Sequence, residues 1–312
     1  MSTALVETES LVKAYGAFRA VDGLDLRLNE GEVYGFLGPN GSGKSTTILM
    51  MLGLTEPTSG NVRVAGHNPT REPLVVKRQV GYLPESVGFY PDLSGKENLM
   101  FTAELNNIPR ADASVRIDEL LDMVELDSAR NQIVGQYSRG MRQRLGLADV
   151  LLKRPSVIIL DDPTLGLDPT GIQWLLEIIG DLSSKQGITI FVSSHQLHEV
   201  QRVCHRVGIM SHGKLVLEGT IPELTSKTAG GGFGIVLDVV GGDDALLASL
   251  RGLPGISSCE RVGGKIIIEG DRDVRSQATA IAFAAGVDLL GATSENRTLE
   301  DIYLRYFAGA EG

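Results

Sequence analysis

Two short stretches carry residues whose types and spacing could bind and hydrolyse phosphates. The first, GPNGSGKST at residues 38–46, matches the pattern G-x-x-x-x-G-K-[ST]. In this pattern glycines let backbone N–H groups turn towards phosphate oxygens, and the helix that follows adds its positive end. Lys44 would reach the β- and γ-phosphates, and the Ser45 hydroxyl would ligate Mg²⁺. We therefore predict a nucleotide site formed by Gly38, Pro39, Asn40, Gly41, Ser42, Gly43, Lys44, Ser45 and Thr46.

The second stretch, VIILDD at residues 157–162, consists of four apolar residues followed by two adjacent aspartates. An enzyme with such a phosphate loop needs a carboxylate on a neighbouring strand to hold Mg²⁺ through its water shell. Asp161 is the predicted metal acid, although an aspartate that only terminates a strand is the alternative. Asp162 then lies beside the place for the γ-phosphate and the attacking water, which makes it the predicted catalytic base.

The elements that must position these residues alternate between strands and helices over the first ~220 residues. Residues 32–54 indicate a strand, a glycine-rich turn and an apolar helix, while 156–162 and 187–195 indicate buried strands. Helical periodicity marks residues 116–126 and 171–185. The predicted fold class is therefore α/β, with a largely parallel sheet.

The composition changes near residue 226. The stretch SKTAGGGFG, residues 226–234, is small and glycine-rich, which is typical of a linker. The residues beyond it read in the order β-α-β-β-α-β, the order of a small ferredoxin-like α+β domain. We predict one domain over 1–225, a linker over 226–234 and a small C-terminal domain over 235–312.

Composition and charge restrict the classes of partner. The formal net charge is −10 and aromatic residues make up 5% of the chain, which argues against a nucleic-acid partner. Cys204 and Cys259 lack the spacing of metal ligands. The N-terminus has no apolar signal segment, and apolar runs such as IAFAAGV, residues 281–287, fall short of the ~20 residues that span a bilayer. We expect a cytoplasmic chain that does not cross a membrane by itself.

Four further motifs follow in a fixed order: VGYLPE (80–85), YSRGMRQR (137–144), LGLDP (165–169) and SSHQLHEV (193–200). With the phosphate loop and the paired aspartates, they resemble the ATP-binding cassette of ABC transporters over residues 5 to about 222. The resemblance implies a RecA-like core, a β subdomain and a helical subdomain. It also implies ATP and Mg²⁺ as cofactors and an integral membrane permease as partner, with the chain peripheral on the cytoplasmic face.

The resemblance also assigns roles to single residues. Tyr15 would stack on adenine, and His195 would be the switch histidine at the γ-phosphate. Ser138 and Gly140 would contact the γ-phosphate of ATP held by a second cassette, because members of this family meet head to tail. Asp168, in the D-loop of the family, is a further predicted ATP-binding residue. Each chain then holds an incomplete site, and a homodimer is expected.

The departures from the family pattern point to one branch. The signature has Tyr137, Arg139 and Met141 where the pattern has Leu, Gly and Gln, and Glu85 replaces the usual glutamine. These variants resemble the type-2 exporters, which include drug, sodium, gliding-motility and copper-enzyme-maturation ATPases. The stretch TLEDIYLRYF, residues 298–307, resembles the end of the small C-terminal domain of that branch. Glu85 is predicted to contact Mg²⁺ or its water. The segment that follows, Ser86 to Leu99, with Phe89 and Tyr90 expected to be exposed, is predicted to dock on the permease, and an ordinary surface loop is the alternative.

The resemblance favours an ATPase subunit that drives a separate permease over two alternative functions. Soluble ABC-type ATPases that act on ribosomes or DNA usually carry two cassettes or a long coiled coil, and this chain has one cassette. A GTPase or small-molecule kinase would need the guanine-binding motif N-K-x-D, which is absent.

Asp162 stands where the family has glutamate. The aspartate side chain is one methylene shorter, so its carboxylate lies farther from the attacking water, and we predict slow hydrolysis.

Overall fold

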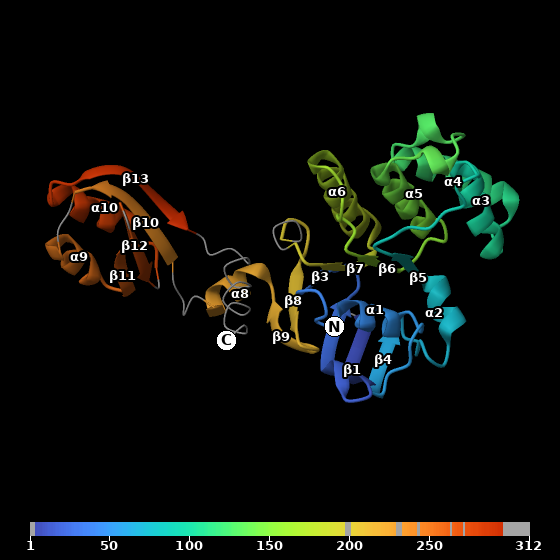
Figure 1. The fold of residues 1–312 in the computed structure, drawn as a ribbon, viewed down its shortest axis with the longest axis horizontal. Helices are drawn as coiled ribbons and strands as arrows, with labels where there is room; N and C mark the ends of the chain where they lie inside the picture. The colour runs from blue at the N-terminus through green and yellow to red at the C-terminus, as the bar shows by residue number, and fades with distance from the viewer. Residues whose placement is uncertain are drawn as a thin grey trace. The chain divides into compact units, whose positions relative to one another are not determined.

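The computed structural model describes six stretches of the chain, namely 4–196, 201–228, 233–241, 244–262, 264–270 and 272–295. Contacts within the chain divide it into two compact units, Met1–Glu218 and Gly219–Gly312 (Figure 1). The predicted domain limits, 1–225 and 235–312, remain a proposal. The predicted C-terminal segment 298–307 lies outside the described residues.

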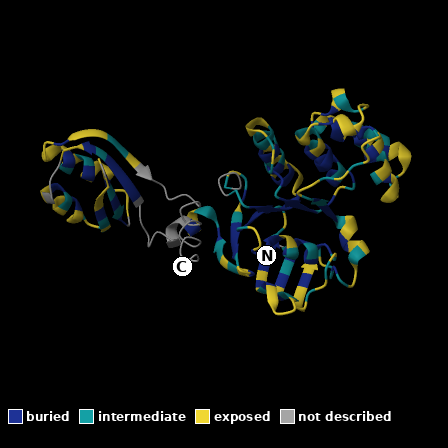
Figure 2. Cartoon of the chain, viewed as in Figure 1, coloured by how far each residue is buried: buried dark blue, intermediate teal, exposed yellow. Residues whose placement is uncertain are grey.

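A six-stranded sheet forms the centre of the first unit. Its order is β5-β6-β7-β3-β8-β9, and the pairings from β5 through β8 are parallel. Strands that are covered on both faces read as continuous apolar runs, and every residue of β3 and β6 is buried (Figure 2). The strands are β3 (Val33–Leu37), β5 (Val80–Leu83), β6 (Val157–Asp161), β7 (Thr189–Ser194), β8 (Arg206–Ser211) and β9 (Lys214–Gly219).

Helices follow the central strands as the sequence predicts. Helix α1 (Lys44–Met51) follows β3, and α6 (Pro169–Gln186) follows β6. Asp168 is the N-cap residue of α6, and its carboxylate accepts a hydrogen bond from the backbone N–H of Gly171 at 2.9 Å. The short helix α2 (Pro73–Gln79) leads into β5. Loops that could act chemically are therefore gathered at the carboxyl ends of parallel strands.

A second, antiparallel sheet of order β2-β1-β4 packs into the same core. It consists of β1 (Ala4–Tyr15), β2 (Phe18–Asn29) and β4 (Ser59–Val64). One cluster of buried residues takes members from this sheet, such as Leu24, from α1, such as Ile48, and from β7, where Phe191 lies. The shared core fixes β1 and β2 beside the loop that precedes α1.

Three helices form a separate layer of the first unit, away from the antiparallel sheet (Figure 1). They are α3 (Gly95–Leu105), α4 (Arg110–Met123) and α5 (Arg139–Leu151). Helix α3 begins with a capping box in which Ser94 and Glu97 cap each other's backbone N–H groups. The central sheet, antiparallel sheet and helical layer match the three-part cassette that the resemblance implies.

The second unit contains helix α8 and a four-stranded antiparallel sheet of order β11-β12-β10-β13, covered by α9 and α10. Its elements are α8 (Ile221–Thr228), β10 (Phe233–Val240), α9 (Asp244–Arg251), β11 (Ile256–Val262), β12 (Lys265–Gly270), α10 (Arg275–Ala284) and β13 (Asp288–Glu295). From β10 onwards this is the predicted β-α-β-β-α-β order. The ends of the predicted linker, 226–228 and 233–234, lie in α8 and β10, where helix and ladder hydrogen bonds continue.

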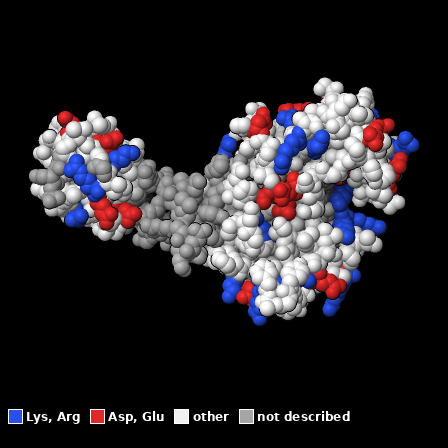
Figure 3. Space-filling view, in the orientation of Figure 1, with Lys and Arg blue, Asp and Glu red and all other residues white. Residues whose placement is uncertain are grey.

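The surface carries mixed charge. On the face of the first unit shown in Figure 3, basic and acidic side chains lie in small neighbouring groups with uncharged areas between them. Within the described stretches, no helix is long and apolar enough to cross a membrane.

Candidate nucleotide-binding site

The phosphate loop connects the end of β3 to the first residue of α1. Gly43 has φ of 111°, and a Cβ there would lie 2.4 Å from the carbonyl oxygen of Ala20 on β2, so only glycine fits. No side chain caps the N-terminus of α1. Its first backbone N–H groups therefore remain available to an anion, which the positive end of the helix also favours.

The side chain of Lys44 extends back across this loop. Its Nζ donates hydrogen bonds to the carbonyl oxygens of Gly38 at 2.8 Å and Pro39 at 3.1 Å. The side chain is buried, and burial lowers the pKa of Lys44, while the negative charges of Asp162 and Asp161 oppose that shift. An ammonium held among carbonyls beside a free helix end is suited to phosphate oxygens.

Two hydroxyls of the loop are placed differently. Ser42 is 3% exposed, and its buried Oγ has no hydrogen-bond partner among the described residues. Ser45 is exposed at the start of α1. An unpaired buried hydroxyl is costly, so Ser42 Oγ is suited to hydrogen-bond a bound group.

Asp161 ends β6 beside the loop. The side chain is 8% exposed, and Ser193 Oγ on β7 donates a hydrogen bond to its Oδ1. Burial raises the pKa of Asp161, and the neighbouring Asp162 and Glu85 add to this, while Ser193 and Lys44 oppose it. A carboxylate held in this way, with the exposed Ser45 hydroxyl, offers the hard oxygen ligands that Mg²⁺ prefers.

Asp162 follows the last residue of β6, and its backbone adopts a left-handed conformation with φ of 44°. Its backbone N–H donates to the carbonyl oxygen and to Oγ of Ser193, both at 3.1 Å. Its Oδ1 accepts hydrogen bonds from His195, from the backbone N–H at 3.2 Å and from Nδ1 at 2.8 Å. An ionised carboxylate only accepts hydrogen bonds, so Nδ1 carries the proton in this contact, and Nε2 makes no hydrogen bond to the part of the chain that the structure describes.

Glu85 and Tyr82 complete this end of the sheet. Glu85 is exposed just beyond β5, near enough for its charge to raise the pKa values of Asp161 and Tyr82. Burial raises the pKa of Tyr82 to about 12, and the negative charge of the nearby Asp161 adds to the shift. Tyr82 and Ser193 lie within the motifs VGYLPE and SSHQLHEV, but they were not predicted as site residues, because the sequence of a strand does not show which of its side chains approaches Asp161.

Tyr15 stands at the tip of the β1–β2 hairpin, where it pairs with Phe18. The ring is 53% exposed, and Lys13 Nζ lies 5.0 Å from its centroid. The hairpin is fixed to the phosphate loop, because Ala20 on β2 packs against Gly43. An aromatic face is thus presented near the loop.

The remaining predicted residues lie elsewhere. Ser138 caps α5 by accepting from the N–H of Met141 at 3.2 Å, and with Gly140 and Asp168 it lines a hollow of about 250 Å³. The guanidinium of Arg144 lies 4.3 Å from the centroid of the Trp174 ring in the same hollow. No phosphate-loop residue is among those that line it. The predicted site residues therefore form two separate groups within one chain.

Comparisons with known proteins agree with this arrangement. Residues 21–165 match the family model described as ABC transporter. The chain is 44% identical over 227 residues to the bacitracin transport ATP-binding protein BcrA of Bacillus licheniformis, covering 73% of each chain. It is 33% identical over 304 residues to the linearmycin resistance ATP-binding protein LnrL of Bacillus subtilis, covering 96% of this chain and 97% of that one.

A solved structure shows the same fold. It is a dimeric, post-hydrolysis state of the ATP-binding cassette MJ0796 bound to ADP and Pi. Its sequence is 26% identical, the TM-score is 0.63, and the match covers 69% of this chain and 98% of that one. From the identity over most of both chains, together with the ordered motifs and their geometry, we conclude that this chain belongs to the ATP-binding proteins of ABC transporters, a family of ATPases.

Proposed function

We propose that two copies of this chain bind two ATP molecules between them and that hydrolysis drives a separate membrane permease, in the direction of export. The division of the predicted site residues into two groups carries this proposal. The phosphate loop, Asp161, Asp162 and His195 form one group, and Ser138, Gly140 and Asp168 form the other. A second copy placed head to tail would bring the second group of one chain to the first group of its partner.

The relatives support the finer parts of the proposal. BcrA is named for bacitracin transport and LnrL for linearmycin resistance, and the MJ0796 cassette is dimeric. An exporter of an apolar or antibiotic-like compound is therefore the transporter class that we propose. The cargo itself would contact the permease, so this chain does not specify it.

Within each site we propose a role for each side chain. Lys44 and the free N–H groups of α1 bind the β- and γ-phosphates, and Tyr15 stacks on adenine. Ser45 and, through water, Asp161 hold Mg²⁺, with Glu85 at its water shell. When bound, Mg²⁺ offsets negative charge on the phosphates.

Asp162 orients the attacking water and accepts its proton, and His195 is aligned by Asp162. Because Nδ1 of His195 is bound to Asp162 at 2.8 Å, Nε2 is the ring atom that can face the γ-phosphate. The two side chains thus act as one unit.

The shared site can be tested by mixing two inactive variants. Lys44→Ala removes the phosphate-binding cation, and Ser138→Arg blocks the second group. In a mixed dimer one composite site keeps both intact groups, so a one-to-one mixture should recover about a quarter of native ATPase activity. Ser184→Arg, at an exposed position on α6, is the matched control and should be active alone. No recovery on mixing would contradict the shared site.

We also propose where the permease docks. The predicted docking segment, residues 86–99, continues into α3. Tyr90 in this segment is 55% exposed and Phe101 on α3 is 39% exposed, and their rings pack edge to face at 5.1 Å. Phe89, expected to be exposed, is half-buried. Exposed aromatic pairs of this kind are typical of interaction surfaces.

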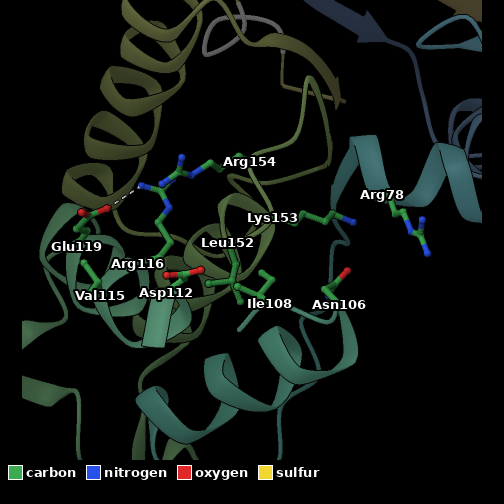
Figure 4. A pocket seen from close by; sticks show the side chains of 10 residues that line it. All are labelled: Arg78, Asn106, Ile108, Asp112, Val115, Arg116, Glu119, Leu152, Lys153 and Arg154. Atoms are coloured by element: carbon green, nitrogen blue, oxygen red, sulfur yellow. Dashed lines mark hydrogen bonds and ion pairs between the residues drawn. The ribbon is translucent and has the colours of Figure 1, made fainter. Parts of the chain in front are cut away.

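A hollow of about 660 Å³ lies along the same helix–helix layer (Figure 4). Asn106, just past α3, lines it together with Arg78, Arg116, Lys153 and Arg154, against the acidic Asp112 and Glu119. The buried Nε of Arg116 has no hydrogen-bond partner among the described residues. We propose that the docking surface continues from the aromatic pair into this basic hollow.

Crosslinking tests the docking surface. Cys204 and Cys259 are buried, so a new surface cysteine reacts against a low background. Cysteines at Gly88 or Asp92 should crosslink to the co-expressed permease, while a cysteine at the exposed Asn61 on β4 should not. Failure at both positions, with equal labelling of all variants by a small thiol reagent, would remove the docking segment from the proposal.

A further inference from the structure

The carboxylate of Asp161 is held from the strands on both sides of it. Strand β6 lies between β5 and β7 in the sheet. Asp161 is paired in register with Ser193 of β7, and Ile159, two residues earlier, is paired with Tyr82 of β5. Ser193 Oγ donates a hydrogen bond to Asp161 Oδ1, and the Tyr82 hydroxyl lies close enough to the same carboxyl group for the charge of Asp161 to raise the pKa of Tyr82. Each neighbouring strand thus contributes one hydroxyl.

Both hydroxyls are themselves fixed. Ser193 is fully buried, and its Oγ also accepts the backbone N–H of Asp162 at 3.1 Å. The Tyr82 ring packs against the main core cluster of the first unit. Ser193 Oγ cannot turn away without breaking its contact with the backbone of Asp162, and the Tyr82 ring is held by the core, so the sheet determines the orientation of Asp161.

We propose that Ser193 and Tyr82 are positioning residues that orient Asp161 for Mg²⁺-dependent nucleotide binding. The proposal rests on the metal role proposed above for Asp161. Groups that hydrogen-bond a metal-binding carboxylate fix its direction, and their loss typically lowers metal affinity by 10- to 100-fold. Ser193 has a further consequence, because the same Oγ contacts the backbone of Asp162 and so keeps the metal acid and the catalytic base in register.

A purely structural role makes a different prediction. If the hydroxyls only satisfied a buried carboxylate, removing one would lower the free energy of unfolding. It would leave the Mg²⁺ requirement of the folded protein unchanged. The concentration of Mg²⁺ needed for tight nucleotide binding therefore separates the two roles.

The experiment measures binding of a fluorescent ATP analogue to the full chain, first in EDTA and then across a Mg²⁺ titration. The variants are Ser193→Ala and Tyr82→Phe, with Ser193→Thr to restore the hydroxyl. Tyr34→Phe is the matched control, because its buried hydroxyl in the same sheet bonds to Glu218 at 3.1 Å, outside the site.

We expect all variants to bind the analogue in EDTA as the native chain does. Ser193→Ala should raise the half-saturating Mg²⁺ concentration about 10-fold or more, and Tyr82→Phe should raise it in the same direction. Ser193→Thr should return it towards the native value, and Tyr34→Phe should not change it. If Ser193→Ala fails to fold, Tyr82→Phe and Ser193→Thr decide the result.

Asp161→Asn separates failure of this inference from failure of the proposed function. If Asp161→Asn keeps the native Mg²⁺ dependence, Asp161 is not the metal acid and the proposed site is wrong. If Asp161→Asn loses that dependence while Ser193→Ala and Tyr82→Phe titrate like the native chain, the metal acid stands and the positioning role is overturned.

Discussion

The exposed ring of Tyr15 gives a quantitative prediction for nucleotide affinity. Stacking of one base on an aromatic side chain contributes about 1–3 kcal/mol. Tyr15→Ala should therefore weaken ATP binding by about 5- to 150-fold, since each 1.4 kcal/mol corresponds to a factor of ten. The result should fall towards the lower end, because the ring is 53% exposed and Lys13 Nζ already lies 5.0 Å from its centroid.

Fluorescence or calorimetric titration with ATP measures this change, and two variants control it. Tyr15→Phe keeps the ring and should bind almost as the native chain does. Phe18→Ala removes the neighbouring aromatic, which is 62% exposed and paired with Tyr15 across the hairpin turn. Native affinity in Tyr15→Ala would refute adenine stacking, and equal losses in Tyr15→Ala and Phe18→Ala would assign the effect to hairpin conformation.

Three further variants test other parts of the structure. Ser94→Ala breaks the capping box with Glu97 and should lower the free energy of unfolding by about 1 kcal/mol, measured in urea. Gly43→Ala places a Cβ 2.4 Å from the Ala20 oxygen, so it should lower the melting temperature and remove the stabilisation by ATP. Burial raises the pKa of Asp149 above 3.8, so the free energy of unfolding of the native chain falls as the pH rises through that raised pKa. Asp149→Asn should lose less stability over the same pH range. Denaturation at several pH values measures the difference.

The convergence of the main site residues could be predicted from the sequence. The phosphate loop has a specific pattern, and Asp161 and His195 each follow an apolar run of strand length. Neighbouring parallel strands end at the same edge, so these side chains had to approach one another. The antiparallel sheet that carries Tyr15 came only from the family resemblance. Buried and exposed residues alternate in β2 only from Leu24 to Leu28, and β1 shows no regular alternation.

The contacts that orient these residues could not be predicted. The hydrogen bond from Ser193 and the approach of Tyr82 to Asp161 depend on the register of β5, β6 and β7, and a shift of one residue would turn each side chain to the other face. The bond between Asp162 and His195 depends on a left-handed φ of 44° at an aspartate, which no local pattern indicates.

The most direct test of the account is the effect of Asp162 on hydrolysis and on binding, measured separately. Turnover is measured with the permease present, and ATP affinity on the same preparations, for the native chain, Asp162→Asn and Asp162→Glu. Asp162→Asn should lower turnover by about 10²- to 10⁴-fold, the usual contribution of a general base, with ATP affinity unchanged. Asp162→Glu should equal or exceed the native rate, because the longer side chain reaches the water that aspartate approaches less closely. Native turnover in Asp162→Asn would contradict the account and leave His195 with the γ-phosphate as the route for the proton.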